Sequence, residues 1–324
     1  MVSRLPEPVT LTDVYKARKI VNKCLVRTPL LKSPSLSKRL GFETYIKCEN
    51  LQPIGAFKVR GGVNLVSRLS EEEKRRGVIT ASTGNHGQSI AYAASLFGVK
   101  AIVALPKNSN PNKVEAIKNF GAHVEFRGSD FDEARFWVEK EAKKKGYRYI
   151  HSANEPLLIA GVGTLYLEIM EDIPDIEAIL TPIGGGSGAA AACIVAKSIN
   201  PEVKIFGVQA EKAPAVYLSW KSKKFVETKS AETFADGLAT RIPFKLTLDI
   251  INKHIDDIVL VSEEEMKKAV LTLLETIHQL AEGAGAASTA AAFKLRKKLQ
   301  GKKVVLVLTG GNLALQNLKS LLMD

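Results

Sequence analysis

Short apolar runs rich in β-branched residues alternate along the chain with longer segments in which apolar residues recur every three to four positions. The short runs have the length and composition of β-strands, and the longer segments have the periodicity of helices with one buried face. We predict strands at residues 44–49, 77–82, 100–105, 123–128, 176–183, 204–210, 257–262 and 302–309. We predict helices at residues 87–98, 111–121, 156–172, 263–283 and 284–299.

This alternation of strands and helices predicts an α/β fold with mainly parallel sheets that helices cover on both faces. Two Ser-x-x-Glu sequences, Ser70 to Glu73 and Ser262 to Glu265, fit the capping box that begins a helix. The chain has no short internal repeat and no obvious linker. We therefore expect two α/β lobes that share one continuous surface, with a cleft between them.

The composition indicates what kind of protein this is and in which cellular compartment it works. The 324 residues are 45% hydrophobic and 25% charged, which suits a soluble globular protein of about two domains. The cysteines, Cys24, Cys48 and Cys193, are scattered and the chain shows no apolar leader, so we expect a cytoplasmic protein. Residues 178–196 are uncharged, but Pro182 and a glycine run would break a lipid-exposed helix, so we expect no membrane span.

The net charge of +12 raises the question of an anionic partner. The lysines are spread along the chain, mostly late in predicted helices, where cations suit the helix dipole. No signature of a nucleic-acid-binding fold accompanies them. We therefore interpret the excess as a solvated surface and expect no nucleic-acid partner.

The run GGGSG, residues 184–188, lies between a predicted buried strand and an alanine-rich helix. Glycines let backbone N–H groups approach an anion closely, and a helix N-terminus behind them adds its dipole. The run lacks the Lys-Ser/Thr pair of a P-loop and the spacing of a dinucleotide fingerprint. A plain tight turn is the alternative, but five small residues at this junction favour the phosphate of a ligand that is not a nucleotide.

Two further loops follow predicted strands and offer hydroxyl groups. The segment TASTGNHGQS presents Ser82, Thr83 and Asn85, which is more than a helix cap needs, and it can hold a carboxylate. His86 alone is weak evidence, because single histidines are often structural. Thr309 ends an apolar strand, so its hydroxyl can reach a ligand at the carboxyl edge of the sheet, although a plain turn fits that loop equally well.

Lys58 follows Ala56 and Phe57 and precedes a pair of glycines in IGAFKVRGG. A lysine near a helix start is usually a solvated charge, and the spacing alone leaves that alternative open. A desolvated amine, however, has a lowered pKa and can form a Schiff base. Pyridoxal phosphate carries both a phosphate and an aldehyde, so a phosphate loop, a carboxylate loop and such an amine together predict this cofactor.

The motifs AFKVRGG, STGNHGQ, HSANEPLLIAGVGT, GGGSG, LAEGAGAA and LTGGN occur in this order. With them the chain resembles, nearly end to end, the pyridoxal-phosphate enzymes of fold type II, and among these the threonine/serine dehydratase and serine racemase group. The resemblance implies a tryptophan synthase β-like fold with the cofactor in the cleft between two lobes. It also implies a large cofactor-binding domain of residues 1–67 and 152–324 and a small substrate-loop domain of residues 68–151.

The resemblance also assigns residues to the site. It makes Lys58 the Schiff-base lysine and catalytic base, and it makes Thr83 a second catalytic candidate. The implied cofactor-binding residues are Phe57, Lys58, Asn85, Asn154, Gly184, Gly185, Gly186, Ser187, Gly188, Glu282 and Thr309. The implied substrate-binding residues are Ser82, Thr83, Gly84, Asn85 and His86.

By the same resemblance we expect β-elimination from L-threonine or L-serine, which yields 2-oxobutanoate or pyruvate and ammonia. A neutral Thr309 beside the pyridine nitrogen limits carbanion delocalisation and suits elimination better than transamination. Racemisation of serine is the alternative, with Thr83 as the second acid or base, and 3-hydroxyaspartate stays open as a substrate. A non-catalytic carrier of the cofactor is a further alternative. We expect a homodimer or a larger homo-oligomer by resemblance alone.

The chain departs from the family pattern at several positions. Ala56 replaces the usual serine of the lysine motif, and Ser187 replaces the fourth glycine of the phosphate loop while keeping its backbone N–H. Where some relatives bind a divalent metal, this chain has Gln209, Ala213 and Ala215, so we expect no metal. The chain ends soon after LTGGN, so we expect no C-terminal regulatory domain.

Overall fold

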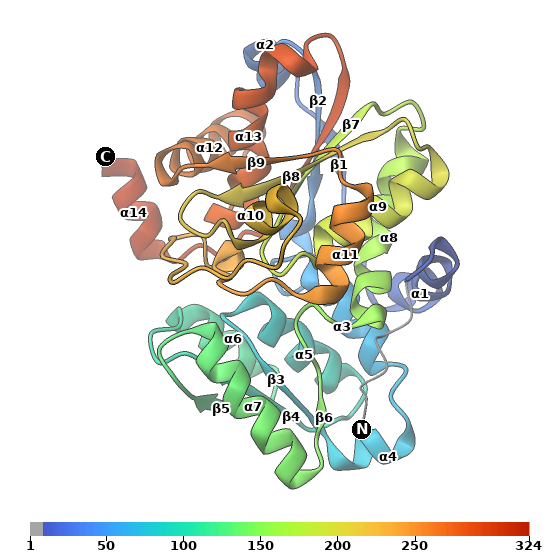
Figure 1. Ribbon diagram of the computed structural model, residues 1–324, viewed down its shortest axis with the longest axis vertical. Coiled ribbons are helices and arrows are strands. Elements are labelled where there is room, and N and C mark those ends of the chain that lie inside the picture. Colours follow the sequence, from blue (N-terminus) through green and yellow to red (C-terminus); the bar gives the residue numbers. More distant parts are fainter. Residues whose placement is uncertain (1–8, 324) are drawn as a thin grey trace.

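Two separate β-sheets form the framework of the molecule, and helices cover both (Figure 1). The computed structural model describes residues 9–323. The larger sheet has the strand order β1 (Leu30–Lys32), β2 (Glu43–Cys48), β10 (Lys303–Leu308), β7 (Ala178–Pro182), β8 (Lys204–Ala210) and β9 (Asp257–Val261). The smaller sheet has the order β5 (His123–Phe126), β4 (Ala101–Leu105), β3 (Val78–Ala81) and β6 (Arg148–Tyr149).

Every strand pair in both sheets is parallel except the pairing of β1 with β2. Parallel strands need crossover connections, and helices supply them here. The larger sheet is accompanied by α1 (Leu11–Cys24), α2 (Pro34–Leu40), α8 (Pro156–Asp172), α9 (Ser187–Ile199), α10 (Ala215–Ser222), α11 (Lys245–His254), α12 (Glu263–Ile277), α13 (Gly283–Leu299) and α14 (Leu315–Met323). The smaller sheet is accompanied by α4 (Glu71–Arg76), α5 (Asn85–Leu96), α6 (Pro111–Asn119) and α7 (Phe131–Lys145).

The predicted fold class is confirmed, and so are the eight predicted strands, each of which overlaps a strand of the structure. Ser70 and Ser262 both cap helices through complete capping boxes, as predicted. One helix boundary was wrong. The predicted helix 263–283 ends at Ile277, because His278 takes a left-handed conformation with φ 57°. Gly283 therefore begins the next helix instead of ending this one.

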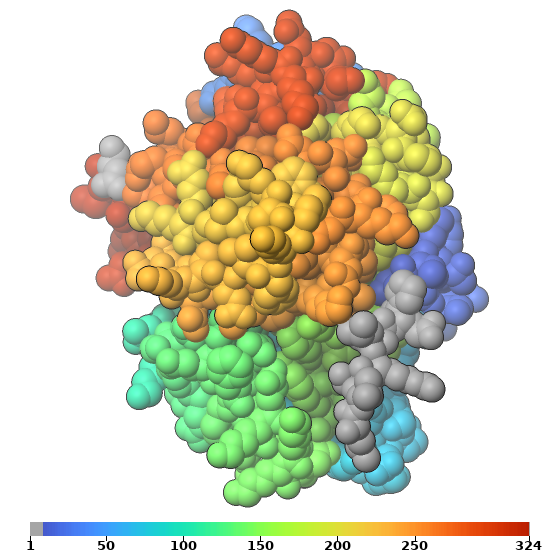
Figure 2. Space-filling view, viewed as in Figure 1, coloured from blue at the N-terminus to red at the C-terminus, as the bar shows by residue number. Residues whose placement is uncertain are grey.

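The two sheets draw on different stretches of the chain. All strands of the smaller sheet lie between residues 78 and 149, whereas the larger sheet combines residues before and after that stretch. In the space-filling view, the smaller sheet's residues, cyan to green, form the lower part of the molecule against the yellow and orange residues above (Figure 2). The domain boundaries after residues 67 and 151 stay a prediction. No helix among residues 9–323 is long and apolar enough to cross a membrane.

One short helix joins the two parts. α3 (Lys58–Val66) packs against α5 of the smaller part and against α8 of the larger part. Close packing explains its paired glycines. A Cβ on Gly61 would lie 2.9 Å from the Leu158 carbonyl oxygen, and a Cβ on Gly62 would lie 2.3 Å from Ser89 Oγ. α3 thus fixes the position of Lys58, its first residue, relative to both sheets.

Candidate active site

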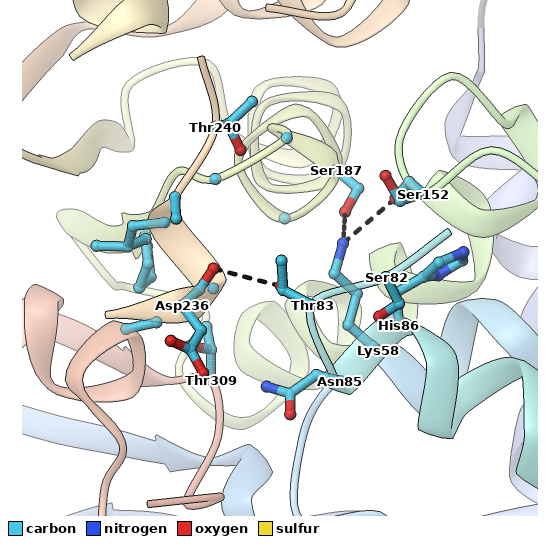
Figure 3. A pocket seen from close by; sticks show the side chains of 18 of the residues that line it. Lys58, Ser82, Thr83, Asn85, His86, Ser152, Ser187, Asp236, Thr240 and Thr309 are labelled. Atoms are coloured by element: carbon cyan, nitrogen blue, oxygen red, sulfur yellow. Dashed lines mark hydrogen bonds between the residues drawn. The ribbon is translucent and has the colours of Figure 1, made fainter. Parts of the chain in front are cut away.

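A cavity lies where the carboxyl ends of strands from both sheets meet (Figure 3). Its walls come from the start of α3, the loop after β3, the glycine loop after β7 and a segment around η2 (Asp236–Leu238). Glu282, just before α13, and Thr309, just after β10, complete the walls. Ligands of open parallel sheets bind at this carboxyl edge.

Lys58 is a half-buried lysine whose amine points into this cavity (Figure 3). Its Nζ donates hydrogen bonds to Ser187 Oγ at 2.8 Å and to the Ser152 carbonyl at 3.4 Å (Figure 3). The Phe57 ring centroid lies 5.3 Å from the same nitrogen. No carboxylate among residues 9–323 forms an ion pair with Lys58. Burial lowers the pKa of this amine to about 8, so a usable fraction is neutral near physiological pH.

The glycine loop after β7 leads directly into the N-terminus of α9. Gly186 adopts φ 89°, which favours glycine, and no side chain caps the helix. A Cβ on Gly184 would lie 2.0 Å from the Gly237 carbonyl oxygen, so only glycine fits there. The first backbone N–H groups of α9 have no acceptor inside the helix and, with the helix dipole, suit a phosphate.

A second helix N-terminus, that of α5, reaches the same cavity from the smaller part. Ser82 Oγ accepts hydrogen bonds at 2.8 Å from the N–H groups of Gly84 and Gly87 and so braces the loop. The N–H groups of Asn85 and His86, the first two residues of α5, have no acceptor inside the helix. This end of the cavity therefore suits a carboxylate.

His86 lines the cavity, but its ring is engaged by the fold. The Thr80 hydroxyl donates to the Ile150 carbonyl at 2.7 Å, so its oxygen accepts from His86 Nε2 at 2.8 Å. Burial, together with the nearby Lys58 amine, lowers the pKa of His86 well below its usual value. His86 is therefore a neutral ring that positions the start of α5, not a titrating group at physiological pH.

A cluster of charged and amide side chains closes the opposite wall. Lys113 of α6 donates to Glu282 at 2.9 Å and to Asp236 at 3.3 Å, and Asn85 also donates to Glu282. Burial works against the charge of Lys113, but the two carboxylates outweigh it and raise its pKa. Asn312 in turn donates to the Asn85 amide oxygen at 2.9 Å. Lys113 thus links the smaller part to two acids of the larger part.

The structure brings most of the predicted site residues together around the cavity, and their individual roles stay predictions. Gly84 and Asn154 do not line it. The Asn154 amide oxygen accepts from the Leu246 backbone N–H at 3.2 Å, and Gly84 makes room for the Lys113 side chain. The predicted residues in the lining are Phe57, Lys58, Ser82, Thr83, Asn85, His86, Gly184, Gly185, Gly186, Ser187, Gly188, Glu282 and Thr309.

Several lining residues escaped the sequence analysis. Lys113, Phe131, Asp236, Thr240 and Phe244 belong to no motif that the sequence singled out. His151 was missed as well, although it does not line the cavity: its Nδ1 accepts from two backbone N–H groups at 3.0 Å and holds the turn whose Ser152 carbonyl meets Lys58. Only the neighbouring Asn154 motif pointed toward that turn.

These residues fit pyridoxal phosphate. The reactive amine lies beside the phosphate-type loop, since Lys58 Nζ is 2.8 Å from Ser187 of that loop. The glycines keep the loop backbone open to a ligand. The Phe57 ring lies beside this loop, since a Cβ on Gly188 would be 3.6 Å from it. At Gln209, one of the positions where the sequence predicted no metal, the side-chain Oε1 accepts from the Tyr217 backbone N–H. No group of three or more metal-type ligands occurs among residues 9–323.

Comparisons with known proteins agree with this geometry. Residues 21–310 match the family model described as pyridoxal-phosphate dependent enzyme. The chain is 42% identical over 305 residues to the L-threonine ammonia-lyase of Thermotoga maritima, covering 94% of this chain and 76% of that protein. It is 38% identical over 311 residues to a catabolic L-threonine dehydratase of Staphylococcus aureus, covering 95% and 90%.

Solved structures give the same picture. Maize serine racemase superposes with a TM-score of 0.92 at 29% identity, covering 98% of both chains. The processed form of threonine deaminase isoform 2 from Solanum lycopersicum superposes with a TM-score of 0.89 at 31% identity, covering 98% of this chain and 95% of that one.

Proposed function

Because the chain belongs to the family of pyridoxal-phosphate dependent enzymes, we propose that it is an ammonia-lyase that converts L-threonine or L-serine to a 2-oxo acid and ammonia. L-threonine gives 2-oxobutanoate and L-serine gives pyruvate. The observation that carries the proposal is one cavity in which the half-buried Lys58 amine faces two helix N-termini. Relatives at 38–42% identity named for threonine support the same reaction.

Pyridoxal phosphate, when bound, supplies the electron sink that makes the α-proton of an amino acid acidic. Lys58 would hold the cofactor. The loop of residues 184–188 and the N-terminus of α9 would bind its phosphate, and Thr309, Asn85 and Glu282 would hold its ring.

The remaining chemistry belongs to side chains of this protein. The N-terminus of α5 binds the substrate carboxylate and so fixes the direction of the bond from Cα to its hydrogen. The Lys58 amine, largely desolvated and with a lowered pKa, takes the α-proton as general base. The β-hydroxyl leaves as water, and the α-proton taken by Lys58 balances the proton that this water gains. The released enamine takes up water and loses ammonia. Phe131 and Phe244 line the cavity and limit the access of bulk water.

The charges of the cavity favour a neutral β-substituent. Apart from Lys58, the cavity lining of the described chain contains one cationic side chain, Lys113, and this is already paired with Glu282 and Asp236. The second carboxylate of 3-hydroxyaspartate would meet no free cation and would lie near Asp236. We therefore expect L-threonine and L-serine to be turned over well ahead of 3-hydroxyaspartate. Measuring 2-oxo acid release from all three tests this, and fastest release from 3-hydroxyaspartate would contradict it.

Serine racemisation is a second candidate, because Thr83 places a hydroxyl in the cavity and maize serine racemase is structurally similar. Within residues 9–323, the Thr83 hydroxyl has a single weak contact, to the Asp236 carbonyl at 3.5 Å, and no base there activates it. Elimination is therefore favoured. Chiral chromatography after incubation with L-serine distinguishes the two reactions. Formation of D-serine without pyruvate would favour racemisation over elimination.

We further propose that the enzyme works in the cytoplasm as a homodimer or larger homo-oligomer. The three free cysteines, two of them buried, are consistent with a reducing compartment. We also propose that residues 1–67 and 152–324 act as the cofactor-binding domain and that residues 68–151 carry the substrate loop. The strands of the smaller sheet, all between residues 78 and 149, and the α5 N-terminus in the cavity wall support this division.

A further inference from the structure

Ser187 combines a departure in sequence with an unusual position. It is the first residue of α9, directly after the left-handed Gly186, and only 2% of it is exposed. Most helices accept small polar residues one position earlier, where the side chain caps the helix. Ser187 makes no such cap. Its side chain is therefore free for another partner.

That partner is the catalytic amine. Lys58 Nζ donates to Ser187 Oγ at 2.8 Å, whereas its other contact, to the Ser152 carbonyl, is longer at 3.4 Å (Figure 3). The three residues come from α3, α9 and the turn after β6, so the contact is not a consequence of local sequence. The lysine side chain is long and flexible, so a hydrogen bond at its end restricts the position of the amine in the cavity.

A hydroxyl is also a neutral partner that serves both forms of an amine. It accepts a hydrogen bond from the ammonium form and can donate one to the lone pair of the neutral form. The Ser152 carbonyl can only accept. A carboxylate would hold the amine in its charged form, which burial here disfavours.

We propose that the Ser187 hydroxyl is a positioning group for Lys58: it holds the free amine at the phosphate-loop end of the cavity, in either protonation state. The amine is free before the cofactor aldehyde arrives and again whenever a substrate has displaced it. The hydroxyl therefore acts on the amine itself, in addition to the backbone N–H of Ser187 that faces the phosphate.

Capture of an aldehyde by the cofactor-free full-length protein tests the proposal without any amino-acid substrate. The visible absorbance band of the Lys58-bound aldehyde is followed by stopped flow with pyridoxal phosphate and, separately, with pyridoxal, which lacks the phosphate. We expect Ser187→Ala to slow capture of both aldehydes by a similar factor, about five- to tenfold, because it removes one hydrogen bond from the amine. The pH midpoint of pyridoxal capture should fall, because the ammonium form loses an acceptor.

Matched variants exclude a merely structural effect. Ser187→Thr keeps a hydroxyl and should restore capture, while Ser219→Ala removes a buried hydroxyl of α10 and should leave capture unchanged. If Ser187→Ala does not fold, as judged by circular dichroism, Ser187→Gly carries the same comparison. Slower capture of pyridoxal phosphate with unchanged capture of pyridoxal would overturn the proposal, because the hydroxyl would then serve the phosphate alone. Unchanged capture of both aldehydes would overturn it as well. Because no amino acid is present, the result is independent of the proposed reaction.

Discussion

At the scale of single residues, the site depends on a lysine kept in neutral surroundings. The sequence placed Lys58 next to apolar residues and glycines, but it could not show which groups surround the amine, because these come from distant loops. The structure supplies a hydroxyl and a carbonyl. Ala56 is fully buried, bridges to Gly310 and has its Cβ 3.2 Å from the place of a Cβ on that glycine. Nothing in the structure explains why alanine stands here in place of the usual serine.

The titration of Lys58 follows from its burial. In the cofactor-free protein we expect acylation of Lys58 by an amine reagent to rise with a midpoint near pH 8, instead of near the ordinary pKa of 10.5. The amine becomes reactive as the pH rises through its pKa, because only the neutral form attacks. Peptide mass spectrometry over a pH series measures this, with Lys58 in the urea-unfolded protein as the reference. Equal midpoints in the folded and unfolded protein would show that Lys58 is solvated.

At the scale of elements, α3 is fixed by charges buried beneath it. Arg60, two residues after Lys58, is fully buried and pairs with Glu49 and Glu168, and Lys47 pairs with Glu168 from the other side. The sequence predicted neighbouring strands and helices well, because their apolar patterns are local. It gave no sign of this network, whose members lie up to 121 residues apart. The spacing of a motif gives information on a single helix, strand or loop, and not on contacts between distant elements.

Breaking this network should be costly. We expect Arg60→Met to lower the free energy of unfolding by about 3–5 kcal/mol, because it leaves two buried carboxylates short of a partner. Arg39→Met is the matched control: it removes an exposed pair with Glu275 and should cost less than about 1 kcal/mol. Urea unfolding followed by circular dichroism compares the two. A similar small loss for both variants would mean that α3 is held by apolar packing alone.

At the scale of the whole molecule, the cavity exists because two sheets meet, and ion pairs hold them together there. Lys113 connects α6 to Glu282 and Asp236, and Arg241 connects the segment after η2 to Asp130 at 2.7 Å. The alternation of strands and helices was enough to predict two α/β lobes with a cleft. The residues that close the cleft could not be predicted, because Lys113 looks like any lysine of an amphipathic helix until the fold places it opposite two acids.

The interdomain pair should matter for turnover. We expect Lys113→Met to lower kcat/KM for L-threonine at least about tenfold, because Glu282 and Asp236 lose their shared cation and Asn85 loses a fixed partner. Lys144→Met changes an exposed lysine of the same part of the molecule and should have no effect. Steady-state kinetics of the two variants loaded with cofactor measure this. An unchanged kcat/KM in Lys113→Met would show that the ion pairs of Lys113 do not contribute to turnover.

The most direct test of the central claim measures 2-oxobutanoate and ammonia formed from L-threonine by the full-length enzyme loaded with pyridoxal phosphate, beside Lys58→Ala. We predict equal amounts of the two products from the unaltered enzyme. In Lys58→Ala the rate should fall at least about a thousandfold, because the variant lacks both the group that holds the cofactor and the general base. No 2-oxobutanoate from the unaltered enzyme, or undiminished turnover by Lys58→Ala, would contradict the assignment.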